Sequence, residues 1–203
     1  MVPALMAETD TLPPHWKLGP AEVWLYPHRL RERGEPTARL ALAQALGQRP
    51  DALPITRDER GRPHLLAPFH SHDVGWSHSG DALLVALGQS VQIGVDLEKM
   101  RPRPRAMILA ERFFHPEELR WLQTLPEQAR EPAFVRLWCA KEAVLKAHGH
   151  GLSFGLDRLC FVEQDGALHL SHCDRRLGPA SDWTLHEWSP LEDYRAALAW
   201  RPG

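Results

Sequence analysis

Cysteine, long apolar runs and an excess of one charge are all scarce in this sequence of 203 residues. The three cysteines, Cys139, Cys160 and Cys173, are odd in number and lack the close paired spacing of a zinc site or a disulfide framework, which indicates a reducing, cytoplasmic setting. No run of about 20 apolar residues occurs, and the N-terminus lacks a basic segment followed by an apolar one, so we expect neither export nor a membrane span. Lys and Arg number 24 against 26 Asp and Glu, so no global positive charge exists to hold nucleic acid.

The rest of the composition is typical of a folded globular protein. Hydrophobic residues make up 43% and charged residues 25%, which is enough apolar material for a core. The length predicts one large domain or two small halves. The 18 prolines and 8 tryptophans are high counts, and they indicate many rigid turns and aromatic side chains in a core or a binding cleft.

Periodicity and turn residues predict short strands and a few helices. In the first half we expect a strand over 21–26, a helix from Pro36 to just before Gly47, and strands at 62–66, 74–77, 82–87 and 91–98. In the second half we expect helices over 106–114, from His115 onward and over 132–148, then strands at 157–163, 166–171, 182–188 and 194–200. The similar order in the two halves predicts an α+β fold of two similar lobes, residues 1–98 and 99–203, each an antiparallel sheet packed with a long helix.

The most informative strand is residues 93–98 (IGVDLE), because Asp96 and Glu98 are two apart and project from the same face. Two adjacent carboxylates repel, and a hard divalent cation such as Mg²⁺ removes that repulsion. Gly94 lets another backbone or a ligand come close. A solvated pair of acids in a turn is the alternative interpretation.

The long helix carries a second group of charged residues. Trp138, Glu142 and Lys146 are four apart and line one face. If that face is inward, Glu142 can complete a metal site and Lys146 can meet a phosphate oxygen. The alternative is a surface Glu–Lys pair beside a core tryptophan.

Three further segments carry polar side chains. Residues 76–80 (WSHSG) offer donors to an anion, but Ser77 and His78 point to opposite faces of an extended chain and do not suit a nucleophile–base dyad. The spacing of His70 and His72 permits zinc, although a plain loop fits better. The Arg-rich turn 57–63 suits phosphate, with solvated charge as the alternative.

These segments occur in an order that resembles the Sfp-type 4'-phosphopantetheinyl transferases. The matching segments are residues 61–63 (GRP), 76–80 (WSHSG), 93–98 (IGVDLE), 112–114 (RFF), 138–146 (WCAKEAVLK) and 151–153 (GLS). The resemblance implies a pseudo-twofold fold with coenzyme A bound between the lobes. It also implies the reaction: a serine hydroxyl of an apo acyl or peptidyl carrier protein attacks the β-phosphorus of coenzyme A, which releases 3',5'-ADP.

The resemblance also implies roles for individual residues. Asp96, Glu98 and Glu142 would hold Mg²⁺ against the pyrophosphate. Lys146 would stabilise or protonate the leaving phosphate, and Glu142 would take the serine proton directly or through a water. The residues implied to contact coenzyme A are Arg39, Arg62, Pro63, Ser77, His78, Lys141 and Lys146. The implied enzyme is a cytoplasmic monomer with no nucleic-acid or membrane partner.

Two other functions fit part of the pattern. An Mg²⁺-dependent phosphodiesterase also uses acids and a lysine, although the net charge of −2 disfavours a nucleic-acid substrate. A non-catalytic module that binds carrier proteins would keep the fold, although Lys146 and all three implied metal ligands are present. Lys99, Arg101, Arg103 and Arg105 form a Pro-stiffened basic stretch that suits an acidic carrier, with a solvated linker as the alternative.

Overall fold

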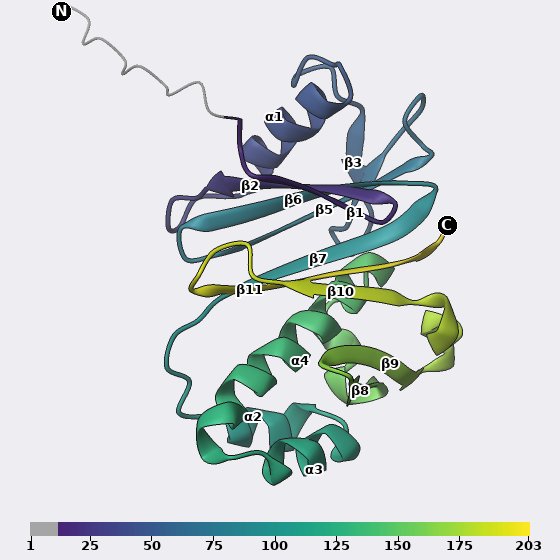
Figure 1. Cartoon of the computed structure of the whole chain (residues 1–203). Helices are drawn as coiled ribbons and strands as arrows, with labels where there is room; N and C mark the ends of the chain where they lie inside the picture. Colours follow the sequence, from purple (N-terminus) through teal and green to yellow (C-terminus); the bar gives the residue numbers. More distant parts are fainter. Residues whose placement is uncertain (1–11) are drawn as a thin grey trace, which may run out of the picture.

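Two antiparallel sheets lie face to face in the middle of the molecule, with helices on their outer sides (Figure 1). The computed structural model describes residues 12–203. The first eleven residues, where no export signal was expected, lie outside the described residues. The first sheet has the strand order β1-β2-β6-β5 and the second has the order β10-β11-β7. The predicted α+β fold with antiparallel sheets is confirmed.

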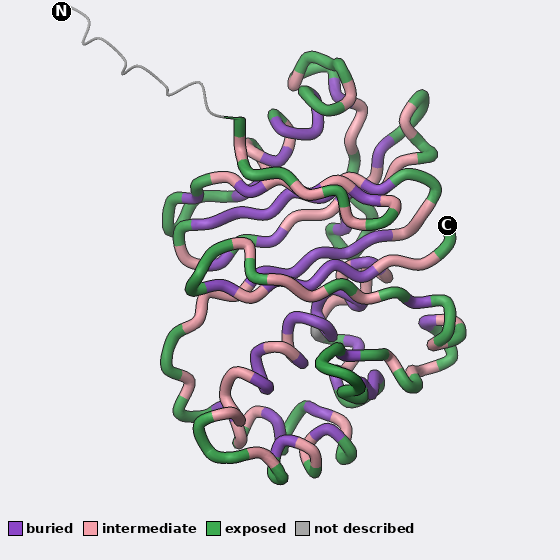
Figure 2. Tube along the Cα trace, viewed as in Figure 1, coloured by how far each residue is buried: buried purple, intermediate pink, exposed green. Residues whose placement is uncertain are grey.

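The first sheet is buried on both faces. It contains β1 (His15–Leu18), β2 (Ala21–Pro27), β5 (His72–Ser79) and β6 (Ala82–Gln89), and α1 (Glu35–Ala45) covers its outer face. Along β6, Leu83 and Val85 pack under α1, whereas Leu84 and Ala86 face the second sheet. This alternation is the two-residue period of a strand, and it leaves β6 and the middle of β7 buried (Figure 2).

The second sheet supports the longest helix. Its strands are β7 (Val91–Lys99), β10 (Thr184–Trp188) and β11 (Tyr194–Pro202), and α4 (Glu127–His148) packs on its outer face, with α2 (Ala106–Phe113) and α3 (Pro116–Thr124) against α4. The hairpins β3 (Ile55–Arg57) with β4 (Pro63–Leu65) and β8 (Leu159–Gln164) with β9 (Ala167–Cys173) complete the fold. Short 3₁₀ turns occur at Leu152–Phe154, Leu156–Arg158, Arg175–Leu177 and Ala180–Asp182.

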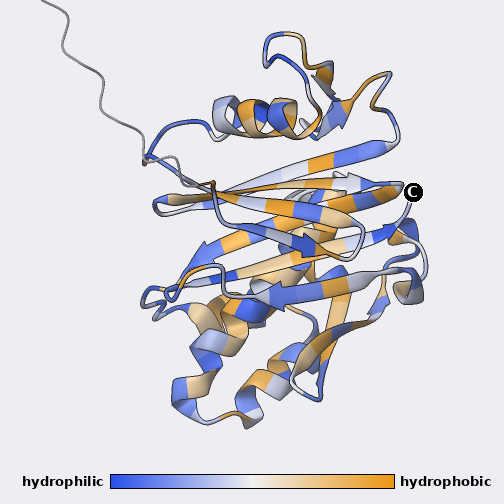
Figure 3. Ribbon diagram, turned by 45° about the horizontal axis from the view of Figure 1, so that its top comes forward, coloured by the Kyte–Doolittle hydropathy of each residue, from blue (hydrophilic) through white to orange (hydrophobic). Residues whose placement is uncertain are grey.

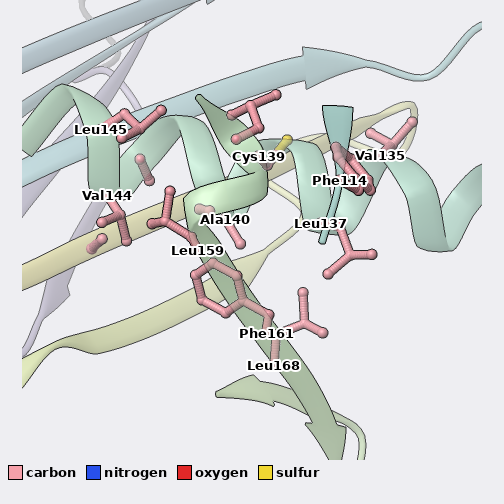
Figure 4. Packing of buried hydrophobic residues seen from close by; sticks show 14 of the residues in the cluster. Phe114, Val135, Leu137, Cys139, Ala140, Val144, Leu145, Leu159, Phe161 and Leu168 are labelled. Carbon is pink, nitrogen blue, oxygen red and sulfur yellow. The ribbon is translucent and has the colours of Figure 1, made fainter. Parts of the chain in front are cut away.

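Gly94 lets α4 approach β7 at backbone distance. A Cβ placed on Gly94 would lie 2.1 Å from the carbonyl oxygen of Ala143 and 2.3 Å from the nitrogen of Ala147. No side chain fits there, so the predicted close approach at Gly94 is a contact with the backbone of α4. The other side of α4 packs on the β8–β9 hairpin through Leu159 and Phe161 (Figure 4). Hydrophobic and hydrophilic residues alternate along helices and strands, as amphipathic elements require (Figure 3).

The structure differs from the sequence-based expectations at a few boundaries. The long helix begins at Glu127 and contains Pro132, which was expected to begin it. Strands β1 and β3 were not predicted because they have only four and three residues and carry no clear periodicity. The boundary expected after Glu98 falls one residue before the end of β7, which is hydrogen bonded to β11. The division into two lobes at that residue stays a prediction.

Among the described residues, none of the helices combines the length and apolarity needed to cross a bilayer.

Candidate active site

The two acidic residues of β7 that were predicted to bind metal face β5. Asp96 Oδ1 accepts a hydrogen bond from Ser77 Oγ at 2.9 Å, and Glu98 Oε2 accepts one from Ser79 Oγ at 3.3 Å. The two contacts lie two residues apart on each strand, so both carboxylates share one face of β7, as their spacing predicts. The Asp96 side chain is only 5% exposed.

Lys146 completes this group from the side of α4. Its Nζ donates to Asp96 Oδ1 at 2.6 Å and to Ser77 Oγ at 2.8 Å. Burial acts to lower the pKa of Lys146, but the Asp96 carboxylate outweighs this effect and raises that pKa, so the ammonium stays charged. The Lys146 side chain is 34% exposed and lines a neighbouring cavity, which lets it meet a ligand.

Glu142 lies one helical turn before Lys146 and is nearly buried. Burial raises the pKa of the Glu142 carboxyl to about 7; the Lys146 charge opposes this rise, and the Asp96 and Glu98 charges add to it. A carboxyl group with this pKa changes its protonation easily at neutral pH, which is what general acid–base chemistry requires.

One buried atom of this group lacks a partner. Asp96 Oδ2 is buried and has no hydrogen-bond partner among residues 12–203. An unpaired buried oxygen is costly, and the neighbouring carboxylates of Glu98 and Glu142 add repulsion. A hard divalent cation relieves both costs, and the three carboxylates offer the oxygen donors that Mg²⁺ prefers. The residues therefore fit a divalent cation.

Arg103 is a contact of this group that the sequence did not indicate. Its Nη2 lies 2.5 Å from Glu98 Oε2, and the Arg103 side chain is 21% exposed. Arg103 was expected to belong to an exposed basic stretch, and that expectation is wrong because the guanidinium turns inward to a carboxylate. Arg101 and Arg105 are exposed as expected, whereas Lys99 pairs with Asp81 at 2.6 Å.

A cavity of about 220 Å³ opens beside Lys146. Arg57, Arg60 and Arg62 also line it, together with Trp76 and small residues of β5, β7 and the end of α4. Arg57, the last residue of β3, and Arg60, in the β3–β4 turn, are exposed, and Arg57 pairs with Glu35 at 2.7 Å. Four cations around a small cavity suit phosphate groups. Arg57 and Arg60 were not among the residues predicted to contact coenzyme A. The Arg-rich turn 57–63 had, however, been identified in the sequence as suited to phosphate.

Arg62 and Pro63, both predicted to contact coenzyme A, lie in the wall of this cavity. The Arg62 guanidinium is buried, forms an ion pair with Asp73, and donates to the carbonyl oxygens of Lys146 at 3.2 Å and Ile93 at 3.4 Å. Arg62 therefore joins the β3–β4 hairpin to α4 and β7, which holds the cavity wall in place.

Three other predicted ligands lie elsewhere. Lys141 is fully buried, and its Nζ pairs with Glu118 at 2.7 Å. The prediction that Lys141 contacts coenzyme A is therefore wrong, because no part of the Lys141 side chain is accessible to a ligand. Arg39 donates to the carbonyl oxygen of Leu53 at 3.0 Å and does not line the cavity. His78 stacks on His28 on the face of β5 opposite Ser77.

The three carboxylates fit a divalent cation, and the neighbouring cavity with its basic lining suits phosphate groups. Comparison with known proteins gives the family of the chain. Residues 92–199 match the profile of the 4'-phosphopantetheinyl transferase superfamily. The chain is 37% identical to the protein slr0495 of Synechocystis sp., over 81% of this chain and 70% of that protein. It is 34% identical to the 4'-phosphopantetheinyl transferase HetI of Nostoc sp., over 86% of this chain and 74% of that protein.

A solved structure, the holo-[acyl-carrier-protein] synthase of Thermotoga maritima, is 21% identical, with a TM-score of 0.43 over 54% of this chain and 62% of that chain. The extent of the sequence matches shows that the chain belongs to the 4'-phosphopantetheinyl transferase superfamily. The resemblance stated from the six segments is confirmed, and so is the expectation of a transferase.

The buried Glu142 carboxyl gives a prediction for metal-free protein. Between about pH 4.5 and pH 7 the folded state keeps a proton on Glu142 that the unfolded chain has lost, so raising the pH through this window destabilises the fold. Gln cannot ionise. We therefore expect Glu142→Gln to be more stable than wild type by about 3 kcal/mol at pH 8, with the difference shrinking toward pH 5. Urea unfolding in chelator at both pH values measures this, and a difference independent of pH would contradict it.

Proposed function

We propose that this protein transfers the 4'-phosphopantetheine group of coenzyme A to a serine of an apo acyl or peptidyl carrier protein, with release of 3',5'-ADP. The observation that carries the proposal is the unpartnered, buried Asp96 Oδ2, which lies among carboxylates and beside a cavity lined by four cations. A pyrophosphate needs both features, since its transfer requires neutralisation of oxygen charge.

The acidic residues and Lys146 would have different roles in the transfer reaction. Asp96, Glu98 and Glu142 would hold Mg²⁺, which when bound neutralises charge on the pyrophosphate and lowers the barrier to attack on phosphorus. Lys146 would stabilise the charge that grows on the leaving 3',5'-ADP. Glu142 would accept the proton of the carrier serine directly or through a water.

The remaining contacts would position the substrate. Arg57 and Arg60 would bind phosphates of coenzyme A, because both are exposed residues that line the cavity. Arg57 would exchange its ion pair with Glu35 for the phosphate. Arg62 would act through its buried contacts with α4 and β7. Arg103 would orient Glu98, its partner at 2.5 Å.

A mass measurement tests the proposal. The protein is incubated with coenzyme A, Mg²⁺ and an apo carrier protein, and the intact mass of the carrier is recorded. The transferase adds one phosphopantetheine group to the carrier. Hydrolysis of coenzyme A without a gain in carrier mass would replace the proposal with a phosphodiesterase, and carrier binding without either reaction would replace it with a non-catalytic module.

Lys146→Ala and Arg60→Ala should separate transition-state from ground-state effects. We expect Lys146→Ala to lower kcat about 100-fold because the ammonium acts on charge that develops in the transition state. We expect Arg60→Ala chiefly to raise KM for coenzyme A. Steady-state kinetics with saturating carrier measure both. An unchanged kcat with a raised KM for Lys146→Ala would make Lys146 a binding residue instead.

The exposed arginines beside the site give a prediction about the carrier. We expect Arg101→Ser with Arg105→Ser to lower kcat/KM for an acidic carrier roughly tenfold at low salt, with the loss narrowing as salt rises, because exposed charges act through association rate. Arg103 is kept, since it holds Glu98. Arg49→Ser, an exposed arginine paired with Asp51, is the control. Salt profiles identical to wild type would place the carrier contact elsewhere.

A further inference from the structure

Four side chains with metal-binding atoms meet where the start of α3 contacts the β8–β9 hairpin. They are His115, Glu117, Cys160 and His172, and one ligand atom of each lies within 4.8 Å of the other three. None of them contributes to the candidate active site described above. Their donors are two imidazole nitrogens, one sulfur and one carboxylate oxygen, a set that suits zinc and disfavours the oxygen-seeking Mg²⁺.

The fold places these side chains together from two directions. Cys160 of β8 and His172 of β9 are direct partners across the hairpin, so their side chains share one face. His115 is the N-cap residue of α3, and Glu117 is the second residue of that helix. The helix start and the hairpin therefore each supply two ligands.

A buried network fixes the helix start against the hairpin. The Glu118 carboxylate accepts a hydrogen bond from the backbone nitrogen of Phe161 at 2.8 Å and pairs with Lys141 Nζ at 2.7 Å. Lys141 Nζ in turn donates to the carbonyl oxygens of Leu156 at 2.8 Å and Leu159 at 2.5 Å. Glu118 follows Glu117 in the chain, and Phe161 follows Cys160. This buried network therefore fixes the backbone that carries Glu117 and Cys160.

Two of the six distances among the four ligand atoms match a tetrahedral site, and all six lie within 4.8 Å. His115 Nε2 lies 3.3 Å from His172 Nε2, and Cys160 Sγ lies 3.7 Å from Glu117 Oε2. Bonds of about 2.0–2.3 Å from a tetrahedral zinc ion separate its ligand atoms by about 3.3–3.8 Å. Binding through Nε2 puts the remaining proton of His115 on Nδ1, so Nδ1 can no longer accept the long 3.3 Å cap hydrogen bond from the nitrogen of Glu117, which is lost. The other half of the capping box, from the nitrogen of His115 to Glu118, is unaffected at 3.0 Å.

We propose that His115, Glu117, Cys160 and His172 form a binding site for a zinc-type divalent ion that is separate from the Mg²⁺ site and ties α3 to the β8–β9 hairpin. Binding replaces the thiol proton of Cys160, which is released to solvent, with a metal–sulfur bond. The thiolate and the carboxylate together balance the two charges of the ion.

Cobalt binding tests the proposal. The purified protein is stripped of metal with a chelator, dialysed under reducing conditions and titrated with Co²⁺. We expect one equivalent to bind with a thiolate charge-transfer band and the visible bands of tetrahedral Co²⁺, with displacement by Zn²⁺ and no displacement by Mg²⁺. Zn²⁺ should also raise the melting temperature.

Matched variants assign the ligands. We expect Cys160→Ser to lose the thiolate band and His172→Asn to bind at least about tenfold more weakly, since loss of even an outer partner of a metal site costs about 10–100-fold. His172 is exposed, so its variant tests the site even if Cys160→Ser does not fold. His169→Asn and Cys173→Ser on β9, and Asp96→Asn in the proposed Mg²⁺ site, should keep the thiolate band of the wild type at the same Co²⁺ concentrations. Absence of the thiolate band in wild type, or wild-type binding by His172→Asn, would overturn the proposal.

Discussion

Replacement of Asp96 by Asn should lower kcat for phosphopantetheine transfer by about a thousandfold or more. Asp96 contributes the buried oxygen that lacks a partner and also pairs with Lys146 at 2.6 Å. Loss of its charge removes the main counter-charge from the proposed Mg²⁺ site, an effect of several kcal/mol, and each 1.36 kcal/mol is tenfold in rate. Excess chelator should abolish turnover of the wild type for the same reason. Initial rates with coenzyme A, Mg²⁺ and apo carrier measure both effects.

The control for Asp96→Asn is Asp81→Asn. Asp81 is a carboxylate in the β5–β6 turn that pairs with Lys99 and does not line the cavity. Its replacement should leave kcat close to the wild-type value. The Asn side chain has the shape of Asp, so melting temperatures close to wild type would show that each variant is folded. Full turnover by Asp96→Asn would show that the proposed metal ligands are wrong.

Gly94→Ala should destabilise the protein by more than about 3 kcal/mol, which is a large part of the stability of an ordinary domain. The new Cβ would meet backbone atoms of α4, the oxygen of Ala143 at 2.1 Å and the nitrogen of Ala147 at 2.3 Å. Backbone cannot rotate away as a side chain does, so α4 must move off β7. The melting temperature should fall by at least about 6 °C for a chain of this size. Urea or thermal unfolding measures this loss.

Gly75→Ala is the matched control on the neighbouring strand β5. A Cβ on Gly75 would have Val95 as its nearest neighbour, at 3.9 Å, which is ordinary contact. We expect its free energy of unfolding to stay within about 0.5 kcal/mol of wild type. Equal stability of Gly94→Ala and Gly75→Ala would show that α4 does not need backbone contact with β7.

Local periodicity was enough to predict the side chains that share one element. Asp96 and Glu98 share a face because a strand has a period of two, and Glu142 and Lys146 are neighbours because a helix repeats every 3.6 residues. Both of these inferences depend on spacing along the chain alone. The resemblance of the six segments to a known family was a separate step, and it was enough to identify the family.

Only the tertiary structure decided which charges meet across elements. Lys141 and Lys146 were predicted on the same helix. Lys141 is fully buried and pairs with Glu118, whereas Lys146 pairs with Asp96 beside the cavity. The inward turn of Arg103 to Glu98 and the gathering of His115, Glu117 and His172 around Cys160 likewise join residues from separate elements. Spacing along the chain carries no information on such pairs, because the packing of helices on sheets and hairpins sets their distances.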